Sequence, residues 1–181
     1  MPYNYMRPKI RYMDATAVTL LRAWNQRRLD ARGENRIAWR GILCRVGVAS
    51  DQPPQGSDAH RIVISKELAQ RKCQDLRSMP LNAAFNLHQH QKPSIIGVIR
   101  QASVEGDALV VSGWLFSKNR PDLVELVKRH QGQLGMSFEA SDTQPEDESA
   151  AVWHLKDFEF TGASVLERKA CAFQSTSFRV G

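Results

Sequence analysis

The pattern of apolar and polar residues predicts a chain built mostly from β-strands. Apolar and β-branched residues mark strands at about 37–48, 61–64, 95–104, 108–116, 133–140 and 152–166. Glu105-Gly106-Asp107 predicts a hairpin turn between two of these strands. The polar stretches 51–58 and 141–149 are expected to be loops, and the second is expected to be the most flexible segment.

Helices are expected at about 14–29, 65–76 and 121–131. Asp14 and Ser65 are capping residues, and Pro121 suits a first helical position. Together the elements predict an α+β, β-rich fold, with a mostly antiparallel sheet or partly open barrel and two to four helices. The expected organisation is a basic N-terminal arm and helix, 1–36, followed by one folded domain, 37–181.

Composition narrows the class of protein. A chain of 181 residues with 42% hydrophobic content suits one domain with a sizeable core. The three cysteines are widely spaced and odd in number, which favours free thiols in a reducing cytosol over a disulfide framework. The sequence shows neither an apolar run near the ~20 residues of a membrane span nor a signal core, so a membrane partner and secretion are not expected.

The net charge of +6 is unevenly distributed. Residues 1–50 hold ten Lys or Arg against three acidic residues. A basic arm of this kind can bind nucleic acid or an acidic protein. A solvated arm and helix face is the favoured interpretation, because no zinc finger or aromatic–basic motif accompanies the charge.

Candidate chemistry centres on one serine and two histidines. Ser137 lies between Met136 and Phe138, which a strand would place on the opposite face. A serine nucleophile needs a base within hydrogen-bond reach, and His88 or His90 can supply it. Two imidazoles can also begin a zinc site, but no further ligands follow at a recognisable spacing, so neither a metal nor a cofactor is expected.

From about Trp39 to Phe178 the chain resembles the tailed-phage prohead (capsid maturation) proteases, which are relatives of the herpesvirus assemblin proteases. The segments that carry the resemblance are 39–48, Asn86-Leu87-His88 with Ile96-Gly97-Val98-Ile99, Gly135-Met136-Ser137-Phe138, and 160–166 followed by 169–173. The resemblance implies an assemblin-like fold and a serine endopeptidase that cleaves scaffold and capsid-protein precursors, and itself. It also implies action inside the procapsid, in the host cytoplasm.

The resemblance assigns roles to individual residues. It implies Ser137 as nucleophile and favours His88 over His90 as base. The phage relatives use an acidic third member, in many cases about where Thr161 stands here. Glu159 is therefore the first candidate and Asp157 the second, while a dyad oriented by Thr161 remains the alternative.

The resemblance extends to two features around the catalytic residues. Arg168 is the nearest arginine that can stabilise an oxyanion, and backbone N–H groups are the alternative. A homodimer through the helix at 121–131 would use Leu123, Leu126 and Val127.

Two other functions compete with the protease. The first is a catalytically inactive capsid-assembly or scaffold protein of the same fold. The second is a nucleic-acid-binding module that uses the basic N-terminus. A steep salt dependence of binding would distinguish the second.

Overall fold

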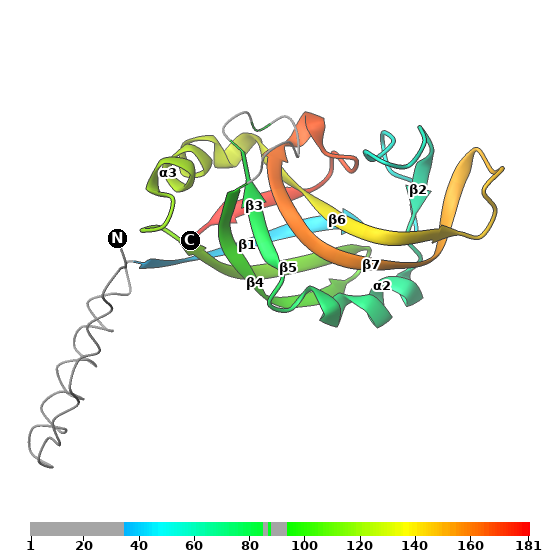
Figure 1. Ribbon diagram of the computed structural model, residues 1–181, viewed down its shortest axis with the longest axis horizontal. Helices are drawn as coiled ribbons and strands as arrows, with labels where there is room; N and C mark the ends of the chain where they lie inside the picture. Colours follow the sequence, from blue (N-terminus) through cyan, green and yellow to red (C-terminus); the bar gives the residue numbers. More distant parts are fainter. Residues whose placement is uncertain (1–34, 85–86, 88–93) are drawn as a thin grey trace, which may run out of the picture. The chain divides into compact units, whose positions relative to one another are not determined.

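One curled sheet organises the part of the chain that the computed structural model describes, residues 35–84, 87 and 94–181 (Figure 1). These residues lie within one compact unit, 34–181. The helix expected at 14–29 lies outside the described residues, as do His88 and His90. The predicted domain boundary after residue 36 stays a prediction.

The sheet of the described residues has eight strands in the order β2-β7-β3-β4-β5-β1-β8, with β6 paired to β7. Their bounds are β1 (Arg36–Arg45), β2 (Arg61–Val63), β3 (Pro80–Ala83), β4 (Ser94–Glu105), β5 (Ala108–Phe116), β6 (Leu134–Pro145), β7 (Val152–Glu167) and β8 (Ser177–Val180). Most pairs are antiparallel, and β7 pairs in parallel with β2 and β3. The sheet curls into an open half-barrel, which confirms the predicted α+β, β-rich fold.

Two α-helices accompany the sheet in the described part of the chain. In α2 (Lys66–Lys72) the Ser65 hydroxyl accepts a hydrogen bond from the Leu68 N–H at 3.1 Å, as expected for an N-cap. The helix α3 (Pro121–His130) starts at proline, which lacks the N–H that a first helical turn leaves unpaired. Neither described helix is long and apolar enough to cross a lipid bilayer.

The packing of α3 corrects the expected dimer surface. Leu123 and Val127 have no exposed surface and belong to the chain's own core. Leu126 is partly buried against the same core. The apolar face of α3 packs inward, so Leu123 and Val127 do not supply a two-fold contact.

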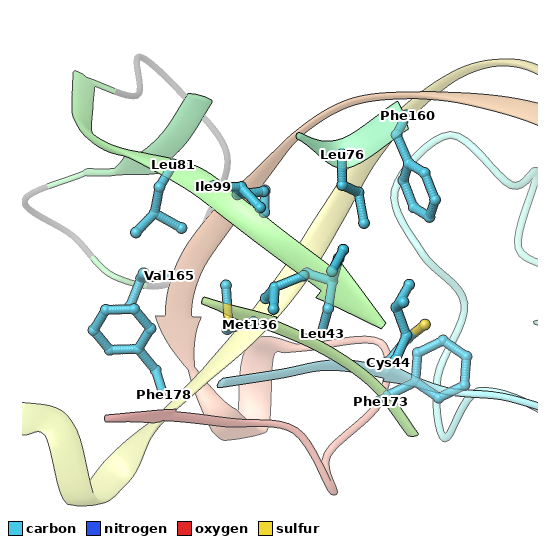
Figure 2. Close-up of a cluster of buried hydrophobic side chains, with 14 of the residues drawn as sticks. Leu43, Cys44, Leu76, Leu81, Ile99, Met136, Phe160, Val165, Phe173 and Phe178 are labelled. Carbon is cyan, nitrogen blue, oxygen red and sulfur yellow. The ribbon is translucent and has the colours of Figure 1, made fainter. Parts of the chain in front are cut away.

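The core fills the inside of the curled sheet. Met136 from β6, Val165 from β7 and Phe178 from β8 point into it beside Leu43 of β1 (Figure 2). Each of these four residues is at most 1% exposed to solvent. Burial of apolar surface is the main force that closes the sheet around them. The opposite face of β6 and β7 is thereby left for polar side chains.

The structure departs from the predicted elements in three places. The strand β6 continues to Pro145, so residues 141–145 form part of a strand and the loop predicted for them is wrong. Its polar residues pair with β7 through an irregular register. The short strands β3 and β8 were not predicted, because each has only four residues and is formed by pairing with strands distant in the sequence.

We predict that Gly113→Ala destabilises the fold. A Cβ at Gly113 would lie 1.9 Å from the Val98 carbonyl oxygen, so the β4–β5 backbone would have to shift. Overpacking of this kind typically costs about 1–3 kcal/mol, which urea unfolding would measure. Gly132→Ala is the matched control, because a Cβ there meets nothing within 4 Å. Equal stability of the two variants would contradict the prediction.

Candidate active site

Ser137 lies on β6 directly opposite Ser164 of β7. Its neighbour Met136 is buried in the core, and Phe138 packs partly buried against Phe158 and Phe160. Successive strand residues point to opposite faces. The Ser137 side chain therefore faces away from the core, as the sequence predicts.

The two facing serines differ in accessibility. Ser164 is only 1% exposed, whereas Ser137 is half-buried. Ser137 and Glu139 line a cavity of about 330 Å³, which Ser164 does not line. The remaining lining residues are Pro54, Gln55, Gly56, Ser57, Ile62, Phe138, Ala140, Thr143 and Leu155. Ser137 is thus the more exposed serine of this pair and the one that lines the cavity.

A polar cluster joins three strands beside Ser137. Glu139 of β6 accepts hydrogen bonds from Asn82 of β3, with Nδ2 at 3.0 and 3.2 Å from its two carboxylate oxygens. The Ser164 hydroxyl of β7 donates to the same carboxylate at 2.6 Å. Asn82 pairs in register with Ser164, and Ser164 pairs with Ser137. The cluster and the candidate nucleophile therefore share one face.

The predicted base lies in the segment that follows β3. His88 and His90 are outside the described residues, but the chain on both sides of them is described. The Leu87 carbonyl accepts a hydrogen bond of 2.7 Å from the N–H of Glu167, the last residue of β7. Ser94 pairs with Ala83 across β3 and β4. The segment that carries both histidines thus connects β3, which contributes Asn82 to the cluster, with β4.

The predicted third members lie farther along β7. Glu159 is exposed and pairs with Ser141, four residues along β6 from Ser137. At about 3.3 Å per residue this separation is roughly 13 Å. Thr161 is exposed and is the extra residue where the register shifts between Glu139 and Ala140. The structure does not bring Glu159 beside Ser137.

Asp157 has a structural partner. Its carboxylate forms an ion pair of 2.7 Å with Lys72 of α2 and also accepts from the Phe158 N–H. The hydrogen bond from Lys72 holds the pKa of Asp157 below its ordinary value, and the positive charge of Lys72 adds to the effect. This carboxylate ties α2 to β7, and Asp157 is not among the residues that line the cavity of Ser137.

Arg168 acts on backbone near the site. Its guanidinium donates to the Gly132 carbonyl at 3.2 Å, and its Cα would lie 3.4 Å from a Cβ at Gly135. Gly135 therefore permits Arg168 and Thr176 to pack closely against β6. The predicted oxyanion role of the arginine stays a prediction.

The cysteines do not offer a competing nucleophile. Cys44, Cys73 and Cys171 are free thiols and all three are buried. Burial raises the pKa of Cys44 to about 12 and that of Cys171 to about 11. The thiolate is the reactive form, so these two thiols are inert near neutral pH.

Sequence reasoning did not identify Glu139, Asn82 or Ser164 as a group. The two-residue period of a strand places Glu139 on the same face as Ser137, and this spacing could have identified Glu139 as a neighbour of the candidate nucleophile. The pairing of β3 with β7 brings Asn82 into the cluster, and no local pattern predicts that pairing.

Comparisons with known proteins do not identify the chain. No family model matches it, and no curated protein matches it significantly.

We predict that Asn82 and Glu139 are energetically coupled. Asn82→Ala should destabilise the fold by about 1–3 kcal/mol, because it removes a donor from a partly buried carboxylate. In a double-mutant cycle with Glu139→Gln, the coupling free energy should be at least about 0.5 kcal/mol.

Glu159→Gln is the control for this cycle, because Glu159 is exposed and distant from Asn82 in the β7 register. Its coupling with Asn82→Ala should be near zero. Chemical unfolding of the single and double variants would measure both couplings. Equal values for the two pairs would show that the hydrogen bonds of Asn82 to Glu139 contribute nothing specific.

Proposed function

We propose that this protein is a serine endopeptidase of phage head maturation. It cleaves scaffold and capsid-protein precursors, and itself, inside the procapsid in the host cytoplasm. The observation that carries the proposal is the position of Ser137, a partly exposed serine that lines a cavity, two residues from a carboxylate held by neighbouring strands. The substrate class rests on the resemblance of 39–178 to prohead proteases.

In the proposed reaction His88 takes the proton of Ser137 while the Ser137 oxygen bonds to the scissile carbonyl carbon. The imidazolium gives that proton to the leaving amine as the C–N bond breaks, which leaves an acyl-enzyme ester. His88 then takes a proton from water as the water oxygen attacks the ester carbon. That proton returns to the Ser137 oxygen as the ester bond breaks and the new carboxyl end leaves.

The cavity beside Ser137 suits a side chain of an extended peptide. Its volume of about 330 Å³ is at the small end of the range for ligand sites. Ile62, Phe138 and Leu155 contribute apolar surface to it, and the loop 54–57 forms another part of its wall. These features support recognition of one apolar substrate residue next to the scissile bond.

Ser137→Ala should abolish cleavage of the co-expressed capsid-protein precursor and leave the fold intact. The variant removes one half-buried hydroxyl, so the expected change in unfolding free energy is within about 0.5 kcal/mol. Gel electrophoresis and mass spectrometry of both chains would detect precursor cleavage and self-cleavage.

Ser141→Ala is the matched control, because Ser141 is an exposed serine on the same strand. It should cleave as the wild type does. Cleavage by Ser137→Ala at the wild-type rate would remove the nucleophile assignment and favour an assembly protein without activity.

His88→Ala should reduce the rate by about 10²–10⁴-fold, the usual contribution of a general base. His90→Ala should retain most of the activity. In the wild type, activity should rise between about pH 6 and 8, because only the neutral imidazole accepts the Ser137 proton. A larger loss in His90→Ala than in His88→Ala would transfer the role of base to His90.

A further inference from the structure

A second hollow, the outer groove, lies over β1, β5 and β4, which are neighbours in the sheet (Figure 1). Its volume is about 760 Å³. Trp114 of β5 lines it and is exposed, whereas Leu115, the next residue, has no exposed surface and belongs to the core. Successive strand residues point to opposite faces, so Trp114 lies on the face turned away from the core. Among the described residues, none lines both this groove and the cavity of Ser137.

Trp114 offers an open aromatic ring to the groove. It is 37% exposed and is the most exposed of the tryptophans in the part of the chain that the structure describes. Its direct partners across the sheet are Ala38 of β1 and Val98 of β4, and directly paired residues stand side by side on one face. Ala38 contributes only a methyl group, so it covers little of the indole. A planar ligand could therefore lie against this ring.

An irregularity in β4 brings an arginine into the groove. The β4–β5 pairing joins Ile99 to Gly113 and Gln101 to Ser112, so Arg100 is the extra residue of a bulge. Arg100 and Gln101 are consecutive, yet both are exposed and both line the groove. A regular strand would direct one of them to the core. The bulge thus adds a guanidinium group to the groove and keeps the amide of Gln101 there.

A fixed turn places a second arginine nearby. Arg77 lines the groove and lies in the turn that leads into β3. The next residue, Ser78, has a φ of 69°, which is uncommon outside glycine, and its N–H donates to the Ile99 carbonyl at 2.9 Å. The Ile99 N–H donates in return to the Met79 carbonyl at 3.0 Å. These bonds hold the Arg77 turn against the residue that precedes Arg100.

The two arginines have no acidic partner. Neither forms an ion pair with any residue that the structure describes, and no aspartate or glutamate is among the described residues that line the groove. Glu105, which accepts a hydrogen bond from Ser103 of the groove wall, is already bound by Arg40 at 2.8 Å through both carboxylate oxygens. The outer groove therefore combines two uncompensated positive charges with an open indole.

We propose that the outer groove binds single-stranded nucleic acid, with Arg77 and Arg100 on phosphate groups and Trp114 stacked on a base. Guanidinium groups match the geometry of phosphate oxygens, and aromatic side chains stack on the bases of single strands. Gln101 and Ser103 supply neutral polar atoms for base edges. An acidic side chain would pair with the arginines and leave the indole open, whereas a nucleotide carries both the charge and the planar ring. The inference does not rest on the proposed protease activity.

Fluorescence anisotropy at several salt concentrations tests the role of the arginines. The protein is the full chain carrying Ser137→Ala, and the probe is a labelled single-stranded oligothymidylate of about 12 nucleotides, within the range of known site sizes. Changing Arg77 and Arg100 to glutamine should weaken binding. It should also reduce the slope of log K against log salt by about 1.4, because each phosphate contact on a single strand contributes about 0.7.

The matched control changes Arg61 and Lys156 to glutamine. Both are exposed and neither lines the outer groove, so the control removes the same charge elsewhere. Its salt slope should stay close to that of the parent protein. The basic residues 1–34 are unchanged in every variant, so their general attraction for nucleic acid is common to all of them.

The role of Trp114 is tested at constant charge. Trp114→Ala should weaken binding at least about fivefold, the lower end of the effect of losing one stacked base. Its salt slope should not change, and Trp114→Phe should recover part of the affinity. Thermal unfolding would verify that each variant is folded.

Three outcomes overturn the proposal. Equal losses in the two charge variants, or an unaffected Trp114→Ala, would show that only general charge attracts the strand. Tighter binding of polyglutamate than of the oligonucleotide would assign the groove to an acidic protein. Tighter binding of single-stranded DNA or RNA than of a duplex of the same length supports it. Wild-type cleavage by Ser137→Ala would overturn the proposed protease and leave this inference unaffected.

Discussion

The antiparallel pairing of β6 with β7 determines which side chains enter the core and which lie on the opposite face of the two strands. Met136 and Val165 lie opposite each other and fill the interior, so Ser137 and Ser164, one residue along, must face outward. A shift of register by one residue would put the serines in the core and the apolar residues in solvent. Burial of Met136 and Val165 in the core therefore determines that Ser137 and Ser164 lie on the opposite face.

An irregularity in the same pairing separates the site from the rest of the hairpin. The register shifts at Thr161, and beyond it the buried positions of β7 become Phe160 and Phe158. A bulge of this kind bends the strand and redirects the side chains that follow. Glu159 and Asp157 consequently belong to the outer part of the hairpin, where Asp157 contacts α2 through Lys72. The carboxylate of Asp157 is therefore paired with Lys72, whereas that of Glu139 is bound by Asn82.

Sequence periodicity predicted the long elements because their signals are local. The strand 108–116 and the helix that begins at Pro121 follow from turn residues and apolar spacing. The short strand β3 has four residues and is defined by its parallel pairing with β7, which no local pattern encodes. Ser137 could be identified as accessible from its apolar neighbours. The hydrogen bond of Asn82 to Glu139 could not be predicted, because it joins residues that are 57 positions apart in the chain.

The position of Glu139 also bears on the acidic residue that the resemblance to prohead proteases leads one to expect near Thr161. A carboxylate is present beside that position, over Gly162, but it comes from the neighbouring strand. In an antiparallel pair, directly opposite residues reach the same space. A carboxylate can therefore serve one site from either strand, provided that the facing residue is small. Here Gly162 is that residue, because the absence of a side chain there leaves room for the Glu139 carboxylate.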